Sequence, residues 1–182
     1  YGLPTSQTFA PSPGVRIHYT ANGSRAARAL ILVHGFAASV HAWRPWTERL
    51  AQDYRLIAID LPGHGLTETP DGYRASLESN AALVDALATH LGVNSFVLAG
   101  NSMGGAVSIA YAMKHPEHLD GLVLIDAAGW PGERAGSGPP PIVFAMLNNG
   151  FTRALMKLVD PRMLARDGLK AAYVDPAIVN EA

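Results

Sequence analysis

Apolar and polar positions divide the chain into two alternating kinds of segment. Four runs of strand length are apolar almost throughout: residues 28–36, 54–63, 95–100 and 119–129. Such runs are typical of strands that are buried on both faces of a parallel sheet. Three segments between them have helical spacing instead: residues 41–53, 76–92 and 103–116. We therefore expect an α/β fold with a doubly wound, mainly parallel sheet.

Local turn and capping residues mark the ends of these elements. Residues 15–23 (VRIHYTANG) alternate in part and end in Asn-Gly, which predicts a further strand that enters a turn. Ser76 is the expected N-cap of the helix over 76–92, and Gly92 is its expected C-terminal stop. The alternation of strands and helices thus begins near residue 15.

The composition changes after residue 129. Residues 130–141 (WPGERAGSGPPP) form a Gly/Pro-rich stretch without periodicity, as a linker would. Residues 142–173 return to helical spacing and are rich in Met, Leu and Phe. We therefore assign residues 1–129 to the core of the sheet and residues 130–182 to a linker and an incomplete helical cap, or lid.

Composition and charge narrow the classes of partner. The chain has 182 residues, a net charge of −1 and no cysteine, which excludes disulfides and thiolate metal sites. Its Lys and Arg residues are scattered, and no apolar run reaches the roughly 18 residues of a membrane span. We expect no nucleic-acid partner, no transmembrane segment, no metal and no cofactor. The first residue is Tyr1, so the compartment stays open between the cytoplasm, which we favour, and export after signal cleavage.

The candidate chemistry centres on one serine. In doubly wound sheets, functional groups gather at the carboxyl ends of the strands, which here are the loops HGF, DLPGHG, GNSMGG and DAAGW. In GNSMGG, Ser102 lies between a buried strand and a helix, with Gly100 and Gly104 two positions away on either side. So tight a turn needs small neighbours and presents its central side chain at the top of the sheet, as in the Gly-x-Ser-x-Gly nucleophile elbow. We expect Ser102 to be a nucleophile rather than part of a Gly-rich phosphate-binding or packing turn.

Three motifs in order give the chain a resemblance to the N-terminal part of an α/β-hydrolase. HGFAASVHAW resembles the His-Gly loop of that family, and GNSMGG resembles its nucleophile elbow. DLPGHGLTETP resembles its Asp-x-x-Gly-x-Gly-x-Ser loop, with Thr67 where Ser is usual. The resemblance covers about residues 15–130. It implies an oxyanion hole formed by the backbone N–H groups of Phe36 and Met103.

Other polar residues at the strand ends have competing interpretations. We expect His34 and His64 to shape their loops rather than act as bases. We expect Asp60 to tie its own turn together through side-chain hydrogen bonds to the backbone. Asp126 is a candidate for the acid of a catalytic triad, because it ends the strand that follows Ser102. Most α/β-hydrolases place this acid one strand later.

No credible general base follows Ser102 in the chain. His115 lies 13 residues further along the outgoing helix, hence roughly 20 Å away at about 1.5 Å per residue, and His118 is scarcely closer. A base must come within about 3 Å of the hydroxyl that it deprotonates. The resemblance places the catalytic His, and most often the acid, after the cap. We therefore expect both beyond residue 182, in a C-terminal remainder of the same protein.

These expectations lead to a serine hydrolase with a helical cap, inactive as residues 1–182 alone. The expected substrate is a small-molecule carboxylic ester, with an apolar part suggested by the Met- and Phe-rich stretch over 142–158. A carbon–carbon hydrolase of aromatic ring-cleavage products is the alternative, although HGFAASVHAW lacks the Gly-rich oxyanion loop of that group. A cofactor-free perhydrolase also fits the scaffold. The alternative of another class is a binding module that retains the pocket without catalysis.

Overall fold

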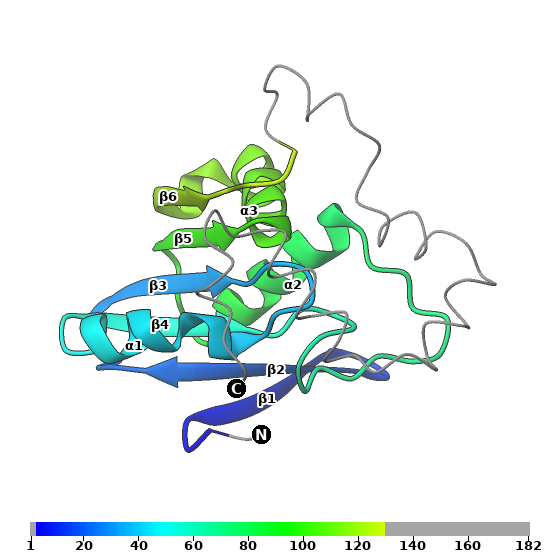
Figure 1. Cartoon of the computed structure of the whole chain (residues 1–182), viewed down its shortest axis with the longest axis horizontal. Coiled ribbons are helices and arrows are strands. Elements are labelled where there is room, and N and C mark those ends of the chain that lie inside the picture. The colour runs from blue at the N-terminus through cyan, green and yellow to red at the C-terminus, as the bar shows by residue number, and fades with distance from the viewer. Residues whose placement is uncertain (1–2, 130–182) are drawn as a thin grey trace, which may run out of the picture. The chain divides into compact units, whose positions relative to one another are not determined.

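The computed structural model describes residues 3–129, which fold around a single six-stranded sheet (Figure 1). The chain divides into two units, Tyr1–Pro131 and Gly132–Ala182, and all the described elements belong to the first. The linker and cap predicted for 130–182 lie outside the described residues.

The sheet is mixed, with a parallel centre and one antiparallel side. Its six strands are β1 (Ser6–Ser12), β2 (Val15–Asn22), β3 (Arg28–Val33), β4 (Tyr54–Ile59), β5 (Phe96–Asn101) and β6 (Leu119–Ile125). Their spatial order is β1-β2-β4-β3-β5-β6. The β4-β3-β5-β6 part is parallel, while β1 pairs with β2 and β2 with β4 in antiparallel fashion. The expected α/β class and mainly parallel sheet are confirmed, but the edge strand β1 was not predicted.

The helices lie in the predicted segments, except that one predicted helix is split in two. They are η1 (Val40–Trp43), α1 (Arg44–Leu50), α2 (Leu77–His90), α3 (Met103–Lys114) and η2 (Pro116–His118). The single helix expected over 41–53 is split into η1 and α1, because Pro45 occupies the first turn of α1 and can begin a helix but not continue one. Ser76 caps α2 as expected, by accepting a hydrogen bond from the backbone N–H of Ser79 at 3.1 Å.

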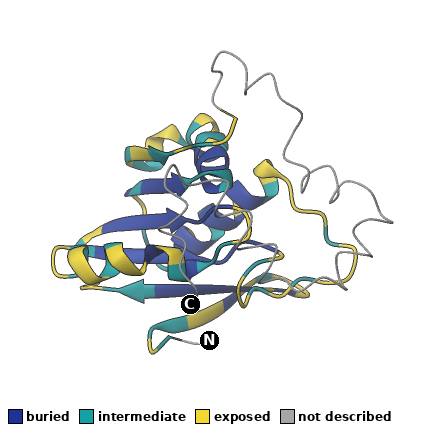
Figure 2. Cartoon of the chain, in the orientation of Figure 1, coloured by how far each residue is buried: buried dark blue, intermediate teal, exposed yellow. Residues whose placement is uncertain are grey.

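Alternate side chains of the central strands pack on opposite faces of the sheet. These strands are buried over most of their length (Figure 2). On one face, Ile31 and Ile57 join a cluster with residues of α2 and α3, such as Leu87. On the other face, Leu32 packs with Trp43 of η1. Because both faces are covered, the central strands carry apolar residues at nearly every position. This packing is the physical reason that these strands could be recognised from sequence.

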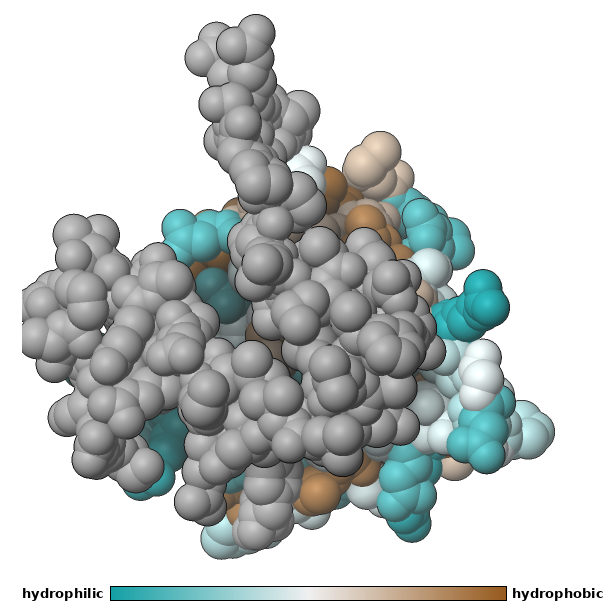
Figure 3. Space-filling view, turned by 45° about the vertical axis from the view of Figure 1, so that its right-hand side comes forward, coloured by the Kyte–Doolittle hydropathy of each residue, from teal (hydrophilic) through white to brown (hydrophobic). Residues whose placement is uncertain are grey.

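Six large apolar side chains are exposed in the described part of the chain. They are Phe36, Leu66, Leu77, Met113, Leu122 and Val123. In Figure 3, hydrophobic and hydrophilic residues are interspersed where the described residues are visible. Leu122 and Val123 belong to β6, which is an edge strand among the described elements.

A buried carboxylate ties together the loops at the carboxyl end of β4. Asp60 is fully buried, and its Oδ1 accepts from the N–H of Val40 at 2.8 Å while its Oδ2 accepts from the N–H of Leu66 at 3.0 Å. Oδ2 also lies 2.7 Å from Nδ1 of His18. The expected tie within its own loop is confirmed, and the carboxylate additionally holds β2 and the start of η1.

Gly65 leaves the space that this carboxylate occupies. A Cβ at Gly65 would lie 1.8 Å from Asp60 Oδ2, whereas a Cβ at Gly63 would meet nothing within 4 Å. Both glycines have positive φ, +55° and +80° respectively. An alanine at either position would therefore strain the backbone, but only an alanine at position 65 would also collide with the Asp60 carboxylate.

We predict that Gly65→Ala destabilises the protein far more than Gly63→Ala. The control carries only the strain of a left-handed alanine, about 1–2 kcal/mol. Gly65→Ala must also displace a buried, fully bonded carboxylate, and we expect a loss above about 3 kcal/mol. Chemical denaturation of the full-length protein measures both values. Equal losses in the two variants would contradict the role assigned to Asp60.

Candidate active site

Ser102 occupies a strained turn between β5 and α3. Its backbone has φ +50° and ψ −115°, a conformation that side-chain-bearing residues rarely adopt and that typically costs about 1–3 kcal/mol. The surrounding backbone holds this geometry. The N–H of Ser102 donates to the carbonyl of Ile125 at 2.9 Å, and the carbonyl of Ser102 accepts from the N–H of Ala128 at 3.0 Å. The end of β6 and the loop after it therefore hold both the N–H and the carbonyl of Ser102.

The glycines around Ser102 permit contacts between backbones. A Cβ on Gly100 would lie 2.3 Å from the carbonyl oxygen of Gly104, and a Cβ on Gly104 would lie 2.2 Å from the carbonyl oxygen of Val33. A Cβ on Gly105 would lie 2.5 Å from the Cβ of Ala127. The helix can start this close to β3, β5 and the loop after β6 only because these positions carry no side chain.

The His-Gly loop lies directly beside the serine. A Cβ on Gly35 would approach the Cβ of Ser102 to 3.3 Å and Asn101 Oδ1 to 2.9 Å. Phe36 follows in a turn that the Ala38 N–H closes by donating to the Gly35 carbonyl at 3.3 Å. Phe36, which is expected to contribute to the oxyanion hole, therefore directly follows the glycine that lies beside Ser102.

Met103 is the first residue of α3, immediately after Ser102. The first N–H groups of an α-helix lack a partner within the helix, and the helix dipole gives this end a partial positive charge. The backbone N–H of Met103 is therefore of the kind that stabilises a developing oxyanion. The assignment of Phe36 and Met103 to an oxyanion hole stays a prediction.

His34 supports the His-Gly loop from beneath. Its ring is completely buried, with Nδ1 2.7 Å from the Gly35 carbonyl and Nε2 accepting from the Leu61 N–H at 3.1 Å. Because a carbonyl can only accept, Nδ1 carries the hydrogen and the ring is neutral. Burial lowers the pKa of His34 below its ordinary value of 6.5. The expected loop-shaping role fits these contacts.

A row of rings links this loop to the one after β4. The ring of His64 lies 5.1 Å from that of His34 and meets the exposed ring of Phe36 edge-on at 5.8 Å. Nδ1 of His64 also lies 3.1 Å from the carbonyl of Pro62 within its own loop. Within residues 3–129, no histidine forms a hydrogen bond to the Ser102 hydroxyl.

The other candidates lie at opposite ends of α3. Asp126 directly follows β6, is exposed, and has φ +45°. Ile125 and Ala128, on either side of it in sequence, bond to the Ser102 backbone, so Asp126 lies near the elbow. Its role as the acid stays a prediction. His115 is the C-cap of α3, whereas Ser102 is its N-cap, as the spacing predicted.

His18 is a buried contact residue at this edge that sequence reasoning missed. It precedes Asp60 by 42 residues, and its ring lies between Asp60 Oδ2 and Ser6 Oγ, 3.0 Å from the latter. No local pattern joins residues at that separation. Only the antiparallel pairing of β2 with β4 brings them together.

A family model described as the alpha/beta hydrolase fold matches residues 28–156. The chain belongs to the alpha/beta hydrolase family. Among its relatives, the uncharacterized hydrolase YugF of Bacillus subtilis is 33% identical over 117 residues, covering 64% of this chain and 43% of that protein. The 2-hydroxy-6-oxo-2,4-heptadienoate hydrolase of Pseudomonas putida is 36% identical over 107 residues, covering 57% of this chain and 39% of that protein.

A solved structure of an esterase from a Rhodococcus species agrees with the fold of this alpha/beta hydrolase. It has a TM-score of 0.60 and 34% identity, and the match covers 68% of this chain and 46% of that one. The chain thus spans less than half the length of each of these three proteins. Among the described residues, no helix is both long and apolar enough to cross a membrane.

We predict that Ser102→Gly is more stable than Ser102→Ala by about 1–2 kcal/mol, although glycine normally destabilises a folded chain. The glycine relieves the positive φ, whereas the alanine keeps it. Equilibrium denaturation of both variants in the full-length protein measures the difference. If Ser102→Ala proves the more stable, the turn is not strained.

The buried state of His34 predicts a pH dependence of stability. Because its pKa is lowered in the folded state, the unfolded chain binds the proton more readily. Its contribution to stability is present above pH 6.5 and is lost as the pH falls through the unfolded and then the folded pKa. Between pH 7.5 and 5.5, we expect the wild-type protein to lose about 1 kcal/mol more unfolding free energy than His34→Gln. An equal loss in the two proteins would contradict the pKa shift assigned to His34.

Proposed function

We propose that the protein is a serine hydrolase that cleaves a carboxylic ester through an acyl-enzyme at Ser102. The observation that carries this proposal is the strained, glycine-flanked turn that places Ser102 between β5 and the N-terminus of α3. Strain of this kind persists where function requires it. The likeness to a Rhodococcus esterase supports an ester over other carbonyl substrates.

In the proposed reaction, Ser102 Oγ attacks the ester carbonyl carbon, and the carbonyl electron pair moves to the oxygen. The backbone N–H groups of Phe36 and Met103 hydrogen-bond to this oxyanion. The tetrahedral intermediate then expels the alcohol and leaves the acyl group on Ser102, and water releases the carboxylic acid. A histidine beyond residue 182 moves the protons, and its acid partner is either Asp126 or a later carboxylate.

The site favours an ester over the carbon–carbon bond of a ring-cleavage product. The 36% identical Pseudomonas hydrolase keeps the second reaction as the alternative within the family. However, the oxyanion loop here continues from Gly35 into Phe36, Ala37 and Ala38 rather than into further glycines. Phe36 is 44% exposed and directly follows Gly35, which lies against Ser102, so we expect its ring to contribute apolar surface to the substrate site.

We predict that a fluorophosphonate probe labels the full-length protein once, at Ser102. Ser102→Ala should abolish labelling, because the probe reports an activated serine hydroxyl. Ser95→Ala is the matched control, since Ser95 precedes the opposite end of β5, and it should label as wild type does. Absence of labelling, or labelling that survives Ser102→Ala, would instead favour a non-catalytic binding module.

The substrate class requires a second comparison. Short p-nitrophenyl esters and a vinylogous diketone should be assayed under the same conditions with full-length protein that the fluorophosphonate probe labels. We expect ester turnover to exceed diketone cleavage by at least about tenfold in kcat/KM, which is about 1.4 kcal/mol of transition-state binding. The reverse ratio would assign the carbon–carbon reaction.

A further inference from the structure

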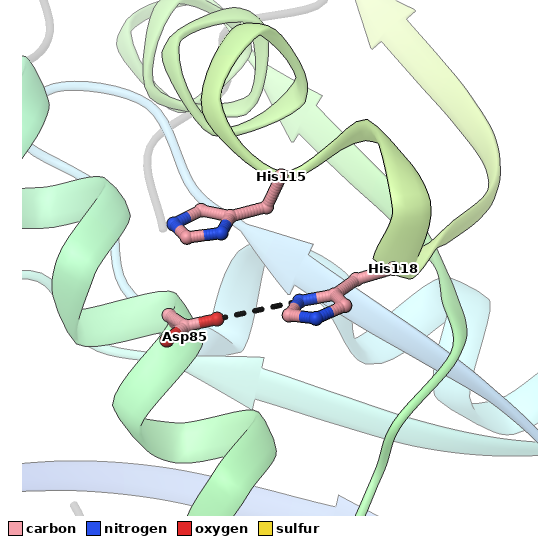
Figure 4. A group of neighbouring side chains, drawn as sticks. All are labelled: Asp85, His115 and His118. Atoms are coloured by element: carbon pink, nitrogen blue, oxygen red, sulfur yellow. Dashed lines mark ion pairs between the residues drawn. The ribbon is translucent and has the colours of Figure 1, made fainter.

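A second group of polar side chains lies at the far end of α3 from Ser102. Asp85 projects from α2, His115 is the C-cap of α3, and His118 is the last residue of η2. One ligand atom from each lies within 4.8 Å of the others. Figure 4 shows the carboxylate of Asp85 and the two imidazole rings facing the same space between the helices.

The separations suit a single small cation. Zinc binds histidine nitrogen and carboxylate oxygen at about 2.0–2.2 Å, so neighbouring ligands of a tetrahedral ion lie about 3.3–3.5 Å apart. His118 Nδ1 is 3.5 Å from Asp85 Oδ1. The other pairs of ligand atoms are no more than 4.8 Å apart, so rotation of these partly exposed side chains has at most about 1.3 Å to close to reach the tetrahedral range.

Two neighbouring groups orient the proposed ligands. Tyr111 is buried, and its hydroxyl donates to Asp85 Oδ1 at 3.1 Å, which fixes the carboxylate. Glu117 Oε1 lies 3.8 Å from His118 Nε2, the ring nitrogen opposite the one that faces Asp85. The Tyr111 hydroxyl also lies 3.1 Å from His118 Nδ1, and because its hydrogen goes to Asp85, it accepts from this nitrogen. A metal at Nδ1 would replace this hydrogen bond and leave the ring proton on Nε2, where it would face the Glu117 carboxylate. Carboxylate partners of this kind are typical around metal-binding histidines.

The charge of the group also favours a cation, because Asp85 and Glu117 both carry carboxylates. The rings of His115 and His118 are nearly parallel, with 7° between their planes and 5.5 Å between their centroids. The side chains of Asp85, His115 and His118 are 34%, 23% and 40% exposed, so an ion can enter from solvent. Imidazole and carboxylate together suit zinc better than magnesium or calcium, which prefer oxygen ligands alone.

We propose that Asp85, His115 and His118 bind one zinc ion that fastens the C-terminal end of α3 to α2. Water completes the tetrahedral site. The ion is structural rather than catalytic, because α3 separates it from Ser102 by the whole length of the helix. Sequence reasoning considered these histidines only as general bases. The signal that was present is the His-x-x-His spacing of 115 and 118, but Asp85 could be added only by the packing of α2 against α3.

Calorimetric titration of the chelator-treated, full-length protein with ZnCl2 tests this site. We expect one zinc ion per chain, and a rise in Tm when zinc is present in excess. Asp85→Asn, His115→Gln and His118→Gln should each weaken zinc binding at least tenfold. His41→Gln is the matched control outside the group and should leave the affinity unchanged.

Two further measurements keep the test decisive if a ligand variant folds poorly. Glu117→Gln changes an exposed side chain and should weaken zinc binding about tenfold while the metal-free Tm stays at the wild-type value. Cobalt(II) in place of zinc should give the intense visible absorption of a tetrahedral site, lost in His118→Gln. Zinc binding that none of these substitutions alters, or no binding at micromolar zinc, would overturn the proposal. Labelling of Ser102 in the wild-type protein does not require the zinc ion, because Tyr111 bonds Asp85 without it.

Discussion

The arrangement of the candidate active site depends on the buried carboxylate of Asp60. A carboxylate without solvent must have its hydrogen bonds supplied by the protein. Here the donors come from the start of η1, from the loop after β4 and from β2, three segments that are not adjacent in sequence. The hydrogen bonds to this one carboxylate therefore fix the relative positions of the segments at the carboxyl edge of the sheet. Gly65 is part of the same constraint, since a side chain there would occupy the place of the carboxylate.

That frame explains why strain at Ser102 can be maintained. The His-Gly loop is held by His34, which bonds Gly35 within the loop and Leu61 next to Asp60. Gly35 in turn lies against Ser102, so the turn is packed on one side by the loop. On the other side, the segment after β6 bonds the Ser102 backbone. A residue at positive φ would relax if its neighbours could move, and here they are fixed by bonds to other elements.

Sequence reasoning succeeded where the physical cause is local. The central strands could be recognised because both of their faces are buried, and Ser102 because its steric requirements fall on Gly100 and Gly104 within the same turn. It failed where a feature depends on contacts between separate elements of the fold. In β1, only Phe9 is buried, so the strand forms by bonding to β2 and leaves no apolar run to detect. The contact of His18 with Asp60 and that of Asp85 with His118 depend in the same way on elements meeting in three dimensions.

The helix α3 connects the candidate active site with the proposed zinc site. At its N-terminus the helix lies against the backbones of β3 and β5, where the glycines permit contact. At its C-terminal end the hydroxyl of Tyr111 bonds Asp85 and so holds the helix against α2. A helix of 12 residues is a rigid rod of about 18 Å, so fixing both ends fixes its axis. Because Ser102 is the N-cap, the direction in which its hydroxyl is presented depends on that axis. The contacts at Asp85, far from the serine, are therefore part of what positions it.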